Sequence, residues 1–166
     1  PEKAESWKAE VISEELHVVH NFDADLEGGF ARKGTPFLAV SYEGLHLVYP
    51  EGQGSKWTTK LMDEANQTNP KGSRGASEVR RSRDPLGVIA TVEPWHGNQV
   101  VVYTPPSDPS QPLWERHVID EQLQWGHAVW CADLDGDGAD ELIIGVRDDP
   151  AKTDTFKERC GVRIYK

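Results

Sequence analysis

The sequence contains little sulphur, and its positive charges are fewer than its negative charges. Its 166 residues include one methionine and two cysteines, and 8% of them are aromatic. No apolar run approaches the length of about 20 residues that a membrane-spanning helix needs. Acidic residues outnumber basic ones by 28 to 18, and the formal net charge is -10. We therefore expect neither a membrane span nor a nucleic-acid partner, since a phosphate backbone attracts basic surfaces.

The two cysteines, Cys131 and Cys160, are too few for a disulfide framework. We expect two buried thiols, and a disulfide is the alternative in an oxidising compartment. The sequence also has no phosphate-binding loop, no paired-cysteine zinc motif and no motif around a Ser-His-Asp set. Its chemistry must therefore come from other residues.

The sequence contains an internal repeat. The segment from Trp7 to His20 aligns without a gap with the segment from Trp114 to His127, and a third copy begins at Trp57. The tryptophans lie 50 (57 − 7) and 57 (114 − 57) residues apart. Periods of this size indicate a propeller, a solenoid or an array.

Short segments rich in Val, Ile, Tyr and Trp, separated by Gly, Pro and Asp, predict β-strands in every copy. They are residues 18–23, 37–41, 44–49, 76–80, 87–92, 99–103, 127–132, 141–146 and 161–165. With the segment after each tryptophan, each copy has four strands, which is the content of a propeller blade. The prediction is an all-β fold: a single partial β-propeller over residues 1–166, with three four-stranded blades at about 1–56, 57–112 and 113–166.

An acidic loop in the third copy predicts a calcium site. Asp133, Asp135 and Asp137 occupy positions 1, 3 and 5 of the loop, Ala139 offers a carbonyl at position 7, and Glu141 is at position 9. Such a set of oxygen ligands suits calcium. It is not an EF-hand, because position 12 is an isoleucine and a strand follows. The alternative is a metal-free acidic turn.

This loop, followed by Leu-Ile-Ile-Gly, resembles the FG-GAP/VCBS family of calcium-bearing β-propellers. A narrower similarity is to the propeller part of the aldos-2-ulose dehydratases (pyranosone dehydratases). It is carried by residues 93–105, 114–118, 129–137 and 161–165. The resemblance implies a larger ring of about seven blades, so three blades form an incomplete ring. It also implies a carbohydrate dehydratase, although nothing here resembles the cupin-like domains of those enzymes.

Two histidines occupy the same position in two copies. His20 and His127 each open the strand that runs toward the acidic loop position, so we expect both to face one end of a central channel. With Glu78 they form a candidate site for zinc or another divalent transition metal. His96 and Glu93 flank Trp95 and are candidate catalytic residues beside a sugar. The alternatives are histidines that only pack between blades and a plain hairpin turn.

Two classes of function follow. The first is a metal-assisted carbohydrate lyase that uses His20, His127, His96 and Glu93. The second is a non-catalytic propeller module, or a fragment, that binds carbohydrate or protein. Three blades leave two uncovered faces, so we expect self-association, such as a dimer that forms a six-bladed ring, or completion by further blades of a parent chain. The calcium loop and the missing initiator methionine favour a secreted or periplasmic location.

Overall fold

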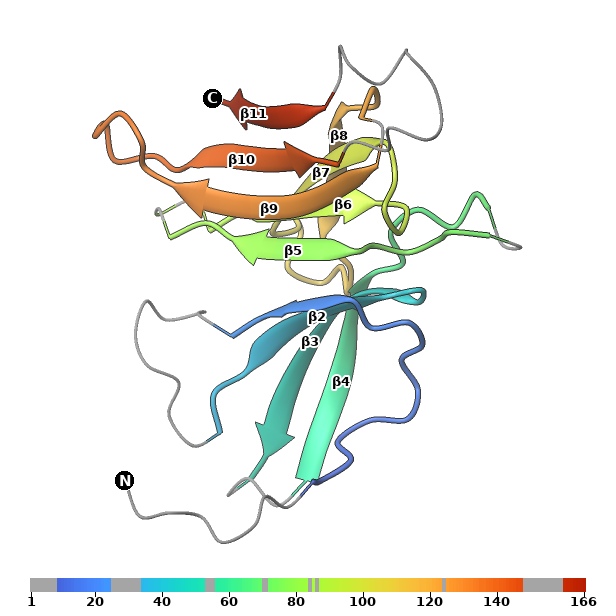
Figure 1. Ribbon diagram of the computed structural model, residues 1–166. Coiled ribbons are helices and arrows are strands. Elements are labelled where there is room, and N and C mark those ends of the chain that lie inside the picture. The colour runs from blue at the N-terminus through green and yellow to red at the C-terminus, as the bar shows by residue number, and fades with distance from the viewer. Residues whose placement is uncertain are drawn as a thin grey trace, which may run out of the picture.

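The structure of the protein, a computed structural model, describes residues 9–24, 34–52, 56–69, 72–83, 85, 87–123, 125–147 and 160–166. Every regular element in this part of the chain is a β-strand, and the strands form three antiparallel sheets (Figure 1). Among these residues no helix is long and apolar enough to cross a membrane. The predicted all-β fold is confirmed.

The three sheets follow one another along the chain. The first contains β1 (Asn21–Asp23), β2 (Phe37–Ser41), β3 (Gly44–Glu51) and β4 (Lys56–Asp63). The second contains β5 (Glu78–Arg81), β6 (Ile89–Glu93), β7 (Gln99–Thr104) and β8 (Glu115–Asp120). The third contains β9 (Gly126–Ala132), β10 (Glu141–Val146) and β11 (Gly161–Tyr165). Each strand pairs with its neighbour in sequence, as in the blades of a propeller.

The sheets begin and end at different residues from the predicted blades. The repeat predicts that the strand after Trp57 opens the second blade, but β4 pairs with β3 and closes the first sheet. In the same way β8, which follows Trp114, pairs with β7 in the second sheet. A sequence repeat has no intrinsic starting point, whereas hydrogen bonding fixes which strands share a sheet. The third sheet accordingly has three described strands, not the four predicted.

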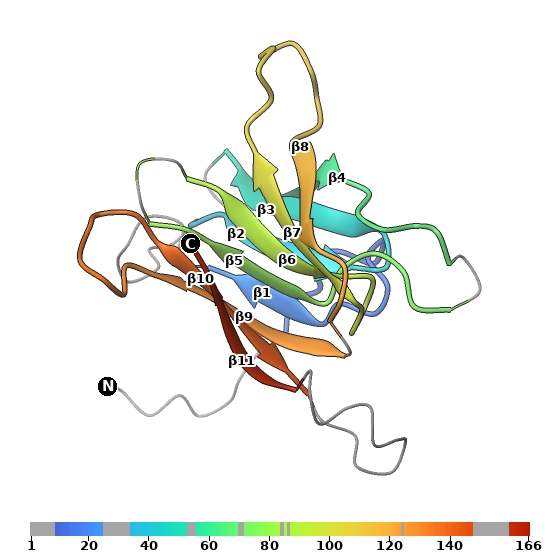
Figure 2. The same cartoon turned by 90° about the horizontal axis from the view of Figure 1, so that it is seen from above.

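The first strands of the three sheets lie together. β5 contacts both β1 and β9, and these three strands cross the middle of the molecule (Figure 2). Residues at the start of β1 and β9 are thereby brought to the same end of the stack of three sheets. This arrangement places side chains from all three sheets within reach of one another.

The middle sheet is buried on both faces. Ile89 of β6 joins the hydrophobic core shared by the first and second sheets. The adjacent Ala90 and Val92 join the core shared by the second and third sheets. Successive side chains of a strand point to opposite faces, so β6 packs against the first sheet through one face and against the third sheet through the other. The stacking fixes the relative position of the residues that form the candidate site.

Candidate metal centre

Three histidines from three sheets meet at one end of the molecule. His20 directly precedes β1, His96 lies in the turn between β6 and β7, and His127 is the second residue of β9. The ring centroids of His20 and His127 are 6.0 Å apart. The structure thus brings the two equivalent histidines together and adds His96 to them.

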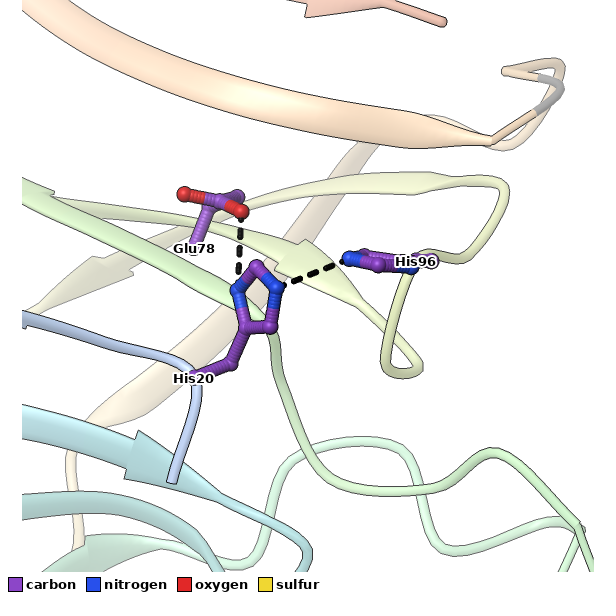
Figure 3. Close-up of side chains that lie close together, drawn as sticks. All are labelled: His20, Glu78 and His96. Carbon is purple, nitrogen blue, oxygen red and sulfur yellow. Dashed lines mark hydrogen bonds and ion pairs between the residues drawn. The ribbon is translucent and has the colours of Figure 1, made fainter. Parts of the chain in front are cut away.

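The closest contact is between His20 and His96. Their Nε2 atoms are 2.9 Å apart, and their rings are almost perpendicular (Figure 3). His96 also stacks with His127, with ring centroids 4.7 Å apart, and with Trp95, with centroids 4.1 Å apart. At this distance one imidazole donates a hydrogen bond to the other. A small separation of the two nitrogens would let both bind one metal ion in place of the shared proton.

The turn that carries His96 is strained. His96 has a φ of 50°, which is uncommon for any residue except glycine. The next residue, Gly97, lies so close to Glu93 that an added Cβ would be 2.3 Å from the backbone oxygen of Glu93. Strain of this kind concentrates at functional sites, where the surrounding structure holds it in place.

Glu78 approaches His20 from the opposite side to His96. Its Oε1 is 3.1 Å from Nδ1 of His20, and its side chain is 5% exposed. Its Oε2 accepts a hydrogen bond of 2.5 Å from Nδ2 of Asn21. One ligand atom from each of His20, Glu78 and His96 lies within 4.8 Å of the others. No sequence motif singles out Asn21, although it directly follows His20.

Burial and charge set the protonation of the cluster. Desolvation, together with the nearby His20, His127 and Arg147, lowers the pKa of His96 to about 4. Its imidazole is therefore neutral at pH 7 and keeps a lone pair for a ligand bond. Desolvation also raises the pKa of Glu78, opposed by the hydrogen bond from Asn21 and by the nearby imidazoles.

Glu93 does not take the predicted position beside a sugar. It has no exposed surface, and its carboxylate accepts hydrogen bonds from Thr91, from Tyr103 and from Arg116, whose Nη2 is 2.7 Å away. A carboxylate enclosed by three protein partners is not available to a sugar. Burial raises the pKa of Glu93 even though Arg116 opposes the shift. We therefore assign Glu93 to the internal framework of the second sheet.

The acidic loop joins β9 to β10 and is folded around its own backbone. Asp133 accepts hydrogen bonds from the backbone N–H groups of Gly136 and Gly138, whose φ angles are 82° and 94°. Glu141 accepts one from Leu134. These bonds hold carboxylates on the inside of a tight loop, as expected where glycines permit the left-handed backbone.

The loop gathers three of the five predicted calcium ligands. Carboxylate oxygens of Asp133, Asp135 and Glu141 lie within 4.8 Å of one another. Oδ1 of Asp137 instead accepts a hydrogen bond from the backbone N–H of Ala139. Nζ of Lys166 is 2.6 Å from Oδ2 of Asp135, so a positive group already neighbours these carboxylates.

Comparison with known proteins gives the family. The family model for the β-propeller domain of aldos-2-ulose dehydratase matches residues 1–106. The chain belongs to this family. The matched range includes His20, Glu78 and His96 of the candidate site. The predicted relationship to aldos-2-ulose dehydratase propellers is confirmed.

One named member of the family aligns with the whole chain. The aldos-2-ulose dehydratase of Phanerodontia chrysosporium is 28% identical over 185 residues, covering 100% of this chain and 20% of that protein. The chain therefore spans about one fifth of the length of this aldos-2-ulose dehydratase. His127 and the acidic loop lie beyond the family-model match but inside this alignment.

Proposed function

We propose that His20 and His96 bind a divalent transition metal such as zinc, and that the site supports the elimination of water from a sugar of the aldos-2-ulose type. The observation that carries the proposal is the 2.9 Å approach of the two Nε2 atoms from two different sheets. Two imidazole nitrogens suit zinc, which prefers nitrogen and sulphur ligands. The family relationship supports the substrate class.

Loss of water beside a carbonyl needs a base for the proton on the adjacent carbon and an acid for the departing hydroxyl. We assign both tasks to His127, which is exposed and stacks with His96. Its imidazole accepts the carbon-bound proton and then passes a proton to the hydroxyl, which leaves as water. The electron pair of the C–H bond becomes the new C=C bond as the C–O bond breaks. A bound metal would polarise the carbonyl oxygen.

The test separates binding from proton transfer. We expect His127→Gln to slow the formation of the conjugated enone from an aldos-2-ulose by about 10²- to 10⁴-fold, the usual contribution of a general base. Zinc affinity should change only a few-fold, because His127 is not among the metal ligands. Equal losses of zinc binding and of turnover would make His127 a ligand, and unchanged turnover would remove it from the reaction.

The acidic loop supports a second proposal, a structural calcium site formed by Asp133, Asp135 and Glu141, with Asp137 and the Ala139 carbonyl joining when the ion binds. All of these donors are oxygen atoms, which calcium prefers. The ion would link the end of β9 to the start of β10, and so brace two paired strands. This is the feature that FG-GAP/VCBS propellers would share with the chain.

A second candidate function is assembly with another propeller surface. Trp130, Ile143 and Ile164 are in register across the three strands of the third sheet. Trp130 is 49% exposed and Ile164 is 54% exposed, on the face opposite the core. Exposed apolar rows of this kind mark interaction surfaces. A second copy of the chain is the occupant we propose, and light scattering should show a dimer that Ile164→Asp dissociates; a monomer at all concentrations would contradict it.

A further inference from the structure

The two ring nitrogens of His20 have different partners. Nδ1 lies 3.0 Å from the backbone oxygen of Ser77 and 3.1 Å from Oε1 of Glu78. Among the described residues, the hydrogen-bond partner of Nε2 is the Nε2 atom of His96. Figure 3 shows Glu78 and His96 at opposite sides of the His20 ring.

The partners of Nδ1 decide where the proton of a neutral His20 resides. The backbone carbonyl of Ser77 can only accept a hydrogen bond, so the nitrogen that faces it, Nδ1, must be the donor. The other nitrogen, Nε2, is then left with its lone pair. In this tautomer the lone pair points toward His96, which is where the proposed metal would be bound.

Glu78 is held firmly enough to impose this choice. It is the first residue of β5, it is almost fully buried, and its second oxygen is occupied by Nδ2 of Asn21. Asn21 is fixed in turn, because its Oδ1 accepts a hydrogen bond from the backbone N–H of Phe22. The chain of contacts connects β5 of the second sheet to β1 of the first.

We propose that Glu78 is a positioning residue and not a metal ligand: it holds His20 in the Nδ1–H tautomer so that Nε2 is presented to the ion beside His96. Because the two ring nitrogens diverge, one ion at Nε2 is not shared with the carboxylate at Nδ1. Carboxylate–histidine–metal triads use this arrangement to orient a ligand and raise its basicity. The ion then keeps coordination positions for water or substrate, as catalytic metals require.

This inference rests on the proposed metal site, but part of its test needs no metal. In the metal-free protein labelled with 15N, long-range proton–nitrogen correlation spectra should show a protonated Nδ1 and an unprotonated Nε2 for His20. A His20 protonated on Nε2 would overturn the proposal. If the wild-type protein bound no metal at all, the proposed function would fail, while this spectrum would still test the Nδ1–H tautomer on which the role of Glu78 depends.

The second part uses cadmium-113 as a spectroscopic replacement for zinc. We expect a scalar coupling between 113Cd and Nε2 of His20, with the proton still on Nδ1. Coupling to Nδ1 would put the ion beside Glu78 and overturn the proposal. The measurement therefore distinguishes an outer carboxylate from a direct ligand.

Substitution provides the third part. Glu78→Gln should weaken zinc binding by about 10- to 100-fold, the usual effect of losing an outer partner of a metal ligand. Glu10→Gln, which removes the same charge from an exposed position, should leave zinc affinity unchanged. Asn21→Ala, which frees one oxygen of Glu78, should cause a smaller loss and serves if Glu78→Gln does not fold. Wild-type affinity in both Glu78→Gln and Asn21→Ala would overturn the proposal.

Discussion

The two candidate cation sites are built in opposite ways. The acidic loop takes all of its ligands from residues 133–141, one connection between adjacent strands of one sheet. The histidine cluster takes His20, His96 and His127 from three sheets, and the first two are 76 residues apart in sequence. The first site is encoded by local spacing, whereas the second exists only when the sheets are stacked.

The sites also differ in the atoms they offer. Carboxylate oxygens suit hard ions such as calcium, and imidazole nitrogens suit zinc and its neighbours. The acidic loop is exposed at Asp133 and Asp135, while the partner of His20 in the cluster, Glu78, is buried. We therefore expect that a substitution can remove either site without loss of the other. Variants of the acidic loop should lose calcium, variants of the histidine cluster should lose zinc, and the two kinds of variant should differ in their effect on stability.

The largest effect should come from removing a nitrogen ligand. His96→Ala takes away one of the two imidazoles that face each other, so zinc affinity should fall by more than the roughly 100-fold expected for an outer partner. Calcium affinity should remain at the wild-type value, because the acidic loop is unchanged. Isothermal titration with each ion measures both. Loss of calcium binding in His96→Ala would show that the two sites are coupled, and would contradict the expectation that each binds its ion independently.

A smaller but clear effect should follow from Asp135→Ala. The variant should lose calcium binding, and with it the stabilisation that a ligand present at 100 times its Kd contributes, about 2.7 kcal/mol. For a chain of this size the midpoint of thermal unfolding in calcium should fall by roughly 5 to 10 °C. Zinc binding should persist.

The matched control for this variant is Lys166→Ala. It breaks the ion pair between Lys166 and Asp135 but keeps every carboxylate of the loop. An exposed pair contributes at most about 1 kcal/mol, so this control should retain both the calcium and nearly all of the thermal stability. An equal fall in both variants would assign the stabilisation to the ion pair and not to calcium.

The smallest effect concerns the segment that carries His20. Glu43 accepts hydrogen bonds from the backbone and ring of His17 and from Oγ of Ser41. Burial opposes ionisation of Glu43, but these bonds outweigh it and hold its pKa below the ordinary value. The stabilisation is therefore present above the unfolded-state pKa near 4.5 and is lost as the pH falls through the lower pKa of the folded state.

Glu43→Gln should accordingly show less loss of stability than the wild type when the pH falls from about 5 to 3, with a difference of about 1 kcal/mol or less because the pair is partly exposed. Urea unfolding at a series of pH values measures this difference. Looser attachment of the segment should also weaken zinc binding a few-fold, with no change in calcium binding. If the free energies of unfolding of the two proteins fell equally with pH, the proposed stabilising role of Glu43 would be wrong.

Local patterns in the sequence were enough to predict much of the fold. The predicted segments 37–41, 141–146 and 161–165 coincide with β2, β10 and β11. Short apolar runs bounded by turn residues carry this information within a few positions. The acidic loop was predictable for the same reason, since all of its carboxylates lie within nine residues.

The rest depended on contacts that no local pattern reveals. The sequence indicated that His20 and His127 occupy equivalent positions, but it did not indicate that the turn at His96 reaches back to His20. It also placed Glu93 beside a sugar, because nothing near Glu93 in the sequence predicts its burial against Arg116 of β8. The sequence repeat also did not indicate which strands share a sheet. The strand that contains Trp57, β4, pairs with β3 of the preceding copy.

Anomalous diffraction from crystals grown with both zinc and calcium tests the central claim most directly. Data collected just above and just below the zinc absorption edge separate the two ions. We predict a zinc peak between the Nε2 atoms of His20 and His96, and a peak without zinc signal within the loop of Asp133, Asp135 and Glu141. Zinc bound only in the acidic loop, or no peak beside the histidines, would contradict the account.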